Sequence, residues 1–206
     1  MTTRTKNDRW IPLTLALLAL GASAAVAAEG AAKPDAAKVE RGKMLVTFGG
    51  CNDCHTPLKM GPKGPEPDMA RMLSGHPESF EISTGTTPAS AQWMMTAAVT
   101  GTAFSGPWGV SFAANLTPDQ NTGLGIWTED MFIRTIRTGK HMGVSRDILP
   151  PMPWPMYRNA TDEDLKSIYA FLRSIRPIHN RVPTPLPPVE QTAENHAPEA
   201  ITASAQ

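Results

Sequence analysis

Five consecutive residues constrain this chain more than any other feature: Cys51, Asn52, Asp53, Cys54 and His55. The spacing C-x-x-C-H is the attachment pattern of c-type haem. Two thiols three positions apart on a helical turn can each bond one haem vinyl group, and the adjacent imidazole then reaches the iron. The chain has two cysteines in all, and both lie in this pattern. We therefore predict one covalent haem c, with Cys51 and Cys54 as tethers and His55 as an iron ligand.

Three other chemistries use closely spaced cysteines, and the chain fits each of them less well. A structural zinc site needs four ligands, usually from a second C-x-x-C or an H-x₃₋₅-H pair, and the chain has neither. A thioredoxin-like C-x-x-C follows a strand in a βαβ pattern, and no such pattern precedes Cys51. A disulfide between Cys51 and Cys54 would close a small, strained loop of little stabilising value.

The N-terminal residues have the pattern of an export signal. Residues 1–10 carry three basic side chains against one acidic side chain, and an apolar run with small residues at its end follows over residues 11–28. This pattern predicts a secretory signal peptide, residues 1–28, cleaved after Ala27 or Ala28, and a location in the periplasm. The alternative is an uncleaved membrane anchor, because the run is just long enough to span a bilayer. Its second half is rich in alanine rather than leucine, which favours cleavage.

The charge balance excludes one class of partner. The chain has 19 Lys and Arg against 19 Asp and Glu. Cleavage after residue 28 removes three basic residues and one acidic residue, so that 16 basic and 18 acidic residues remain, a net charge near −2. No stripe of Lys and Arg is present, and we expect no nucleic-acid partner. The remaining 178 residues suffice for one domain with a modest core.

Three helices are marked by their caps and by apolar spacing. The first begins at Asp35 as N-cap and runs to the glycine pair before Cys51. The second begins at Thr128 and is closed by Gly139. The third begins at Thr161, which forms a capping box with an aspartate three residues later, and its apolar stripe ends before Pro177.

The segments between these helices are richer in proline and glycine. Residues 56–77 are predicted to be loop, and residues 93–117 a β-hairpin that turns at residues 105–109. The alternating prolines of residues 148–156 exclude helix there and hold the segment extended. Residues 183–206 are rich in Pro and Ala with few apolar side chains, so we expect a disordered tail and place the folded domain at residues 29–182.

Several short stretches resemble one known family. The order of helix, CxxCH, loops, Met-Pro and helix is similar to that of monohaem class I cytochromes c, and most closely to the cytochrome c modules that accompany periplasmic dehydrogenases. The resemblance covers about residues 39–182. The matching stretches are residues 40–42, 51–57, 115–119, 123–127, 137–139, 151–153, 161–165 and 169–172. Members with several haems differ from this chain, which has a single CxxCH.

The resemblance implies a fold, and it implies a crossing of two helices. It predicts a mostly α, cytochrome c-like fold around one covalent haem, with a β-hairpin and loop insertion between the haem motif and a distal Met. In this fold the N-terminal helix crosses the C-terminal helix, and Gly42 suits the crossing because a small residue lets two helices approach closely.

The sixth ligand of the iron decides between electron transfer and chemistry at an open site. Met152 matches the Met-Pro position of the family, and the prolines around it would limit the freedom of the loop. Met156 and His141 remain as alternatives, as does an iron without a sixth protein ligand. A Met is usually core filler. We expect that role for five methionines of the middle region: Met60, Met69, Met72, Met94 and Met95.

Four other residues have two interpretations each. Trp127 and Trp154 either line the haem pocket or pack in the core. Asn115 and Thr117 either donate hydrogen bonds at the haem edge or cap a turn.

These features together predict an exported electron-transfer cytochrome rather than an enzyme. The resemblance implies His/Met axial ligation by His55 and Met152, a periplasmic dehydrogenase as donor and a respiratory acceptor. Membrane association is expected only if the N-terminal segment stays uncleaved. Two alternatives remain: a fixed haem subunit of a dehydrogenase complex, and a haem enzyme or sensor with an open iron position.

Overall fold

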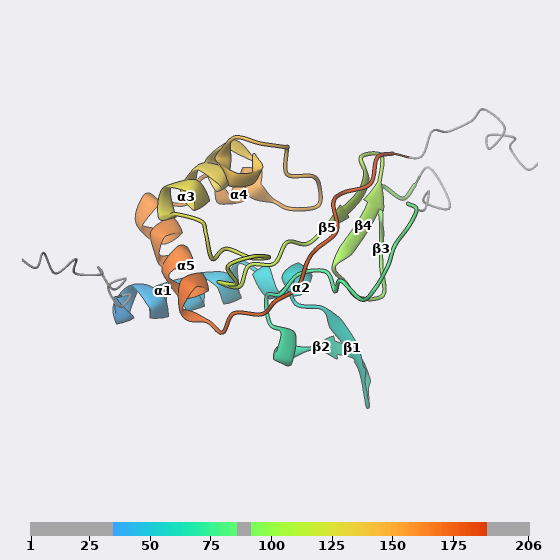
Figure 1. Ribbon diagram of the computed structural model, residues 1–206, viewed down its shortest axis with the longest axis horizontal. Coiled ribbons are helices and arrows are strands. Elements are labelled where there is room, and N and C mark those ends of the chain that lie inside the picture. Colours follow the sequence, from blue (N-terminus) through green and yellow to red (C-terminus); the bar gives the residue numbers. More distant parts are fainter. Residues whose placement is uncertain (1–34, 86–91, 189–206) are drawn as a thin grey trace, which may run out of the picture. The chain divides into compact units, whose positions relative to one another are not determined.

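A computed structural model describes residues 35–85 and 92–188 of the chain. Helices α1, α3, α4 and α5 gather on one side of these residues, and the sheet of β3, β4 and β5 lies on the other (Figure 1). The helices are α1 (Ala36–Phe48), α2 (Cys51–His55), α3 (Glu129–Thr138), α4 (Trp154–Tyr157) and α5 (Asp162–Ser174), with 3₁₀ turns η1 (Met69–Arg71) and η2 (His141–Gly143). The strands are β1 (Leu58–Gly61), β2 (Gly64–Pro67), β3 (Thr96–Ala97), β4 (Ala103–Gly106) and β5 (Gly109–Phe112).

The fold is mixed α and β, and the predicted "mostly α" class was wrong in this respect. The strands form two antiparallel sheets, a β1–β2 hairpin and a three-stranded sheet in the order β3–β4–β5. The sequence pattern indicated the second sheet only as a hairpin, and it missed the first sheet because four prolines favoured a loop. Pro65 and Pro67 are tolerated in β2 because a two-stranded sheet leaves one edge of each strand unpaired. Gly64, at φ +116°, begins β2 directly after the turn at residues 62–63.

The three capped helices are confirmed. Asp35 accepts a hydrogen bond from the Ala37 N–H at 2.9 Å and begins α1. Thr128 begins α3 in the same way, and Gly139 closes it in the left-handed conformation. Thr161 accepts from the Asp164 N–H at 3.1 Å and begins α5. The local signals therefore set these helix ends as expected.

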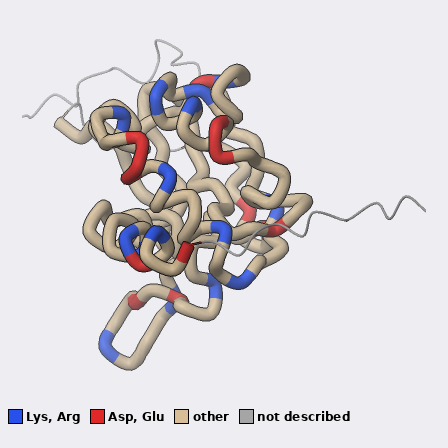
Figure 2. Tube along the Cα trace, turned by 90° about the vertical axis from the view of Figure 1, so that its left-hand side faces the viewer, with Lys and Arg blue, Asp and Glu red and all other residues tan. Residues whose placement is uncertain are grey.

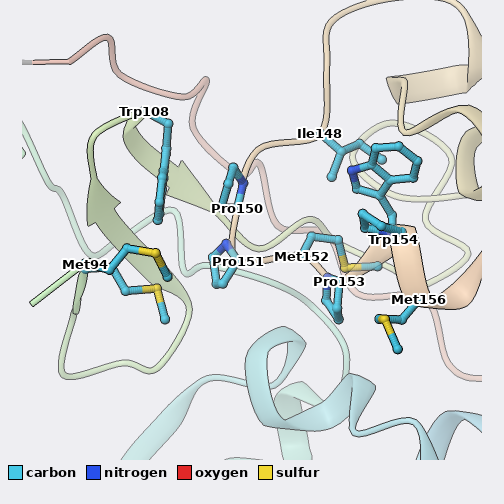
Figure 3. Close-up of a pocket in the computed structure, with 11 residues that line it drawn as sticks. Met94, Trp108, Ile148, Pro150, Pro151, Met152, Pro153, Trp154 and Met156 are labelled. Carbon is cyan, nitrogen blue, oxygen red and sulfur yellow. The ribbon is translucent and has the colours of Figure 1, made fainter.

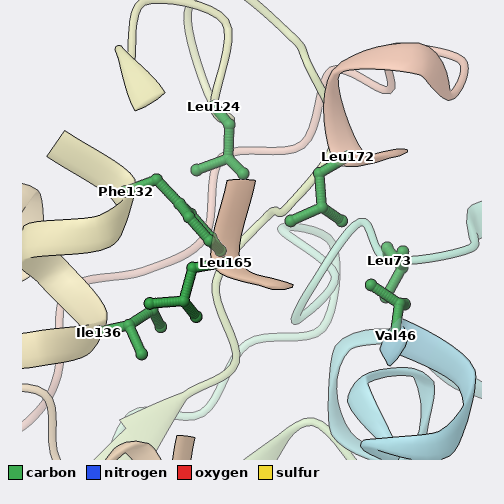
Figure 4. Packing of buried hydrophobic residues seen from close by; sticks show 7 residues of the cluster. All are labelled: Val46, Leu73, Leu124, Phe132, Ile136, Leu165 and Leu172. Atoms are coloured by element: carbon green, nitrogen blue, oxygen red, sulfur yellow. The ribbon is translucent and has the colours of Figure 1, made fainter. Parts of the chain in front are cut away.

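The core lies where α1, α3 and α5 meet the loops that precede α3. Its buried side chains are Val46, Leu73, Leu124, Phe132, Ile136, Leu165 and Leu172 (Figure 4). Cys51, Met152 and Tyr157 pack against this cluster from its edge. The haem motif and the predicted distal ligand are therefore both supported by one hydrophobic core.

Two proline-rich segments differ from expectation. Residues 148–156 are not extended throughout, because α4 begins at Trp154. Pro155 is compatible with this helix, since the first turn of a helix needs no N–H donor for an internal bond. The expected disordered tail also begins too early at residue 183. Residues 183–188 are described, and Leu186 forms an antiparallel bridge with Val110 of β5.

The C-terminal segment is held at Asn180, which is buried. Its side-chain amide donates to the carbonyls of Ser74 and His76 at 2.7 and 2.8 Å. Its side-chain oxygen accepts from Arg71 and from the Glu78 N–H. This side chain thus fastens the segment after α5 to the loops that follow the haem motif, and the segment then continues to the edge of β5.

Two surface properties bear on partners. Lys and Arg segments are interspersed with Asp and Glu segments on the described trace, and Figure 2 shows no continuous stripe of one sign. Within residues 35–85 and 92–188, no helix has the length and apolar character needed to cross a membrane. The predicted signal peptide, residues 1–28, lies outside the described residues, and so does the tail from residue 189.

Candidate haem-binding site

The CxxCH motif forms its own short helix rather than the last turn of α1. Gly50, at φ +66°, lies in the left-handed region and separates Phe48, the last residue of α1, from Cys51, the first residue of α2. Cys51 and Cys54 are half-buried free thiols on α2. Burial raises the pKa of the Cys51 thiol to about 11 and also raises the pKa of Cys54, with Asp53 acting in the same direction. Both thiols are therefore neutral at pH 7.

His55 is buried, and its ring is held by one hydrogen bond. Its Nδ1 lies 2.7 Å from the carbonyl oxygen of Ala114, which comes just after β5. A carbonyl only accepts, so Nδ1 carries the proton and donates it, and Nε2 keeps its lone pair. Burial lowers the pKa of His55 below its usual value, and the hydrogen bond to Ala114 opposes this shift. The structure therefore presents a neutral imidazole whose Nε2 is unprotonated, the form that binds iron.

Met152 lies on the wall of a pocket formed mostly by the proline-rich segment. The pocket has a volume of about 390 Å³, within the usual range for small-molecule sites. Figure 3 shows the Met152 thioether between Pro151 and Trp154. The lining residues are Met94, Met95, Trp108, Ile148, Pro150, Pro151, Met152, Pro153, Trp154, Pro155 and Met156. Residues of α2 are not among the described residues that line it.

The alternative ligands occupy different surroundings. Met156 also lines the pocket, but its side chain is 72% exposed, whereas Met152 packs against the core. His141 does not line the pocket; its ring stacks edge-on against Trp127 at 5.2 Å between centroids. Its Nδ1 lies 3.3 Å from the Ser145 hydroxyl.

Of the other residues considered from the sequence, some methionines differ from expectation, and one pair of loop residues fits one of its two expected roles. Met60, Met69 and Met94 are mostly exposed rather than core filler, and Met94 and Met95 line the pocket. Asn115 Oδ1 accepts from the N–H and the hydroxyl of Thr117, and the Asn115 amide also donates to the Ile178 carbonyl of the segment after α5 at 2.8 Å. The interpretation of this pair as a turn cap fits these bonds.

The insertion sheet supports the Met152 segment, which sequence reasoning did not indicate. Ser111 of β5 donates from its hydroxyl to the carbonyl of Pro150 at 2.5 Å. Trp108, at the turn between β4 and β5, lines the same pocket. Its Nε1 is buried and has no hydrogen-bond partner among the described residues. The sequence indicated only the turn at Trp108. It could not indicate the bond from Ser111, because the acceptor is a backbone carbonyl, which every residue has.

The residues present fit a c-type haem. Two neutral thiols lie on one short helix, Nε2 of the adjacent imidazole is unprotonated, and the pocket beside Met152 has apolar walls. The orphaned Trp108 N–H suits a planar apolar group that carries hydrogen-bond acceptors. Among the described residues, no three His, Cys, Asp or Glu side chains are grouped closely enough to hold a metal ion by themselves.

Comparison with known proteins identifies subunits of dehydrogenases as relatives of the chain. The chain is 29% identical over 163 residues to a nicotinate dehydrogenase subunit of Pseudomonas putida, an alignment that covers 78% of this chain and 10% of that protein. It is 38% identical over 74 residues to the gluconate 2-dehydrogenase cytochrome c subunit of Pantoea cypripedii, covering 35% of this chain and 16% of that protein. No model of a protein family matches the chain.

A third relative matches over a similar share of the chain. The cytochrome c subunit of the quinone-dependent alcohol dehydrogenase of Gluconacetobacter polyoxogenes is 26% identical over 145 residues, covering 70% of this chain and 23% of that protein. The chain thus spans between a tenth and a quarter of the length of these three relatives. The predicted resemblance to cytochrome c modules of dehydrogenases is confirmed.

Proposed function

We propose, from this kinship with cytochrome c subunits of dehydrogenases, that the chain is an electron-transfer cytochrome with one covalent haem c. Cys51 and Cys54 tether the haem, and His55 and Met152 are its axial ligands. The bound haem supplies a one-electron couple, and a Met thioether opposite His raises its reduction potential. The protein itself makes and breaks no bond in a substrate, so it is not an enzyme.

The hydrogen bond from His55 Nδ1 to the Ala114 carbonyl is the observation that carries this proposal. It leaves Nε2 of a buried imidazole unprotonated, on the residue next to the two free thiols of α2. The bond fixes the tautomer and the ring orientation before any iron arrives, which is how proteins commonly prepare a histidine ligand.

Met152 is the better supported of the two thioether candidates. Its side chain is partly buried against the core, and the carbonyl two residues before it is held by Ser111. Met156 is largely exposed on α4. A ligand needs a fixed position, and the structure supplies more support for the position of Met152.

The partners follow from the relatives. The named relatives are dehydrogenase subunits, and we propose that a dehydrogenase is the electron donor and a respiratory component the acceptor. We place the protein in the periplasm, exported by residues 1–28. Because three relatives carry the matched segment inside a longer protein, a fixed haem subunit of such a complex is the second candidate.

The test is covalent haem attachment in a host with a c-type maturation pathway. A denaturing gel stained for haem peroxidase activity should show a band at the mass of the mature chain. Cys54→Ser should abolish or greatly weaken this band, whereas Ser145→Ala, an exposed change, should retain it. Extraction of all haem from the wild type by acidified organic solvent would contradict the proposal.

A further inference from the structure

Tyr157 joins the segment that carries Met152 to the segment that carries the haem motif. Its phenolic hydroxyl donates to the carbonyl of Gly49 at 2.5 Å, across 108 positions of sequence. Gly49 is the C-cap of α1, two residues before Cys51, and Tyr157 is the last residue of α4. A Cβ placed on Gly49 would lie 3.8 Å from the Tyr157 ring and 3.9 Å from the Cys51 sulfur. The ring therefore lies beside the first haem tether.

The segment around Met152 depends on such side-chain bonds. Its prolines remove backbone donors, and α4 has only four residues. Two side-chain bonds flank Met152 in sequence: Ser111 holds the carbonyl of Pro150 on the side of the sheet, and Tyr157 reaches the carbonyl of Gly49. Of these two bonds, only the bond of Tyr157 connects the Met152 segment to the residues that precede Cys51.

We propose that Tyr157 is a positioning residue for the sixth ligand: its hydrogen bond to Gly49 holds the Met152 segment against the haem-attachment turn. The bond thereby limits how often the Met152 sulfur leaves the iron and admits an external ligand. This inference rests on the proposed function, because it requires a haem ligated by Met152. Tyr157 acts through Met152 and the backbone of Gly49, and it needs no contact with the iron.

The chain contains a matched control, because it has two tyrosines in all. Tyr169 on α5 also donates to a backbone carbonyl, that of Trp127, at 2.5 Å. Both side chains are half-buried, and burial raises the pKa of both hydroxyls. The described bond and ring contact of Tyr169 lie toward Trp127 and Phe132 rather than toward the haem motif. Tyr169→Phe thus removes an equivalent bond at a different place.

The experiment measures how fast imidazole binds to the ferric holoprotein at saturating imidazole, where departure of the protein ligand limits the rate. Tyr157→Phe should raise this rate about threefold to tenfold, the range that loss of one hydrogen bond allows. Tyr169→Phe should change it less than twofold. Tyr157→Leu, which keeps an apolar side chain without the hydroxyl and adds no iron ligand, is the second variant and should behave like Tyr157→Phe. Equal rates in Tyr157→Phe and Tyr169→Phe, fast or slow, would overturn the proposal.

A double variant separates positioning from a direct effect on the haem. In a Met152→Ala background no thioether remains to be held, so adding Tyr157→Phe should change imidazole affinity less than twofold. A tenfold change in that background would overturn the inference. If the proposed ligation by Met152 is itself wrong, the result differs, because Met152→Ala alone would then leave the wild-type spectrum unchanged.

Discussion

Gly42 of α1 lies directly against the backbone of Ser167 in α5. A Cβ built on Gly42 would be 1.9 Å from the Ser167 carbonyl oxygen and 2.6 Å from its carbonyl carbon. Backbone atoms cannot rotate away as the end of a side chain can, so this crossing admits no larger residue. Arg41 and Asp164 form an ion pair at 2.9 Å between the same two helices.

The close approach makes Gly42→Ala a sensitive test of the helix crossing. We expect this change to destabilise the protein by about 1–3 kcal/mol, because α1 and α5 must separate to relieve the overlap. Urea unfolding of the holoprotein measures the loss. Lys43→Ala, an exposed change on the same helix, is the control and should stay within about 0.5 kcal/mol of the wild type. Equal stability of both variants would show that the helices do not cross at Gly42.

The parts of the fold that sequence predicted are those with local signals. Asp35, Thr128 and Thr161 each cap a helix with their own side chain, so a few neighbouring residues suffice to place the helix start. The crossing at Gly42 was also expected, but from the resemblance to a known family. The β1–β2 hairpin and α4 were missed, because proline composition alone does not distinguish a loop from an edge strand or the first turn of a helix.

In the candidate site, too, the features with a local sequence signal were predicted and the others were not. The spacing of Cys51, Cys54 and His55 is itself the signal, and the prolines drew attention to Met152. The supports were not visible: His55 bonds to a backbone carbonyl 59 residues away, and Tyr157 bonds to one 108 residues away. A carbonyl is common to every residue type, so only the folded structure can show which one is used.

The assignment of Met152 predicts the spectrum of the ferric protein. A thioether bound to ferric haem gives a weak charge-transfer band in the far red. Met152→Ala should remove the band, lower the reduction potential and open the iron to cyanide or carbon monoxide. Met156→Ala is the matched control and should leave all three properties unchanged. The opposite behaviour of the two variants would make Met156 the ligand, and no effect of either would remove the main support for an electron carrier.

The predicted signal peptide sets the N-terminus of the mature chain. After export, intact-mass analysis should find Ala28 or Glu29 as the first residue, because the small residues before them suit signal peptidase. Retention of residues 1–27 together with membrane association would instead indicate an anchor. Arg4→Glu combined with Lys6→Glu should reduce export, since the basic n-region would be lost.

His76 predicts how stability depends on pH. The ring is fully buried, with Nε2 2.8 Å from the Phe80 carbonyl oxygen and Nδ1 2.9 Å from the Thr102 hydroxyl. Burial lowers the pKa of His76 below its usual value, and Arg71 acts in the same direction. The unfolded chain therefore takes up a proton at a higher pH than the folded protein does. His76 therefore causes no loss of stability well above about pH 6.5, and the free energy of unfolding declines as the pH falls below that value.

Denaturant unfolding at about pH 7.5 and pH 5.5 measures this contribution. The wild type should lose stability between the two pH values. His76→Gln should be less stable at both, because buried bonds are changed, but its loss between them should be smaller. An identical pH dependence in wild type and variant would assign the effect to other groups.

The bridge between Leu186 and Val110 predicts where the folded domain ends. The two residues exchange backbone hydrogen bonds at 3.0 Å in both directions, and a Cβ on Gly109 would lie 2.1 Å from the Leu186 carbonyl oxygen. A chain that ends at Val182 loses these contacts, whereas a chain that ends at Pro188 keeps them. Comparing the two truncations isolates the contribution of residues 183–188.

We expect the chain ending at Val182 to be less stable than the chain ending at Pro188 by about 1–3 kcal/mol, the value of two net hydrogen bonds. Leu186→Ala in the longer chain keeps the backbone bonds and should lose less. The effect should extend to the haem site, because β5 also carries Ser111, which holds the Pro150 carbonyl two residues before Met152. Imidazole should therefore bind faster to the ferric form of the shorter chain. Equal unfolding midpoints for the two truncations would show that the folded domain ends at residue 182, as the sequence predicted.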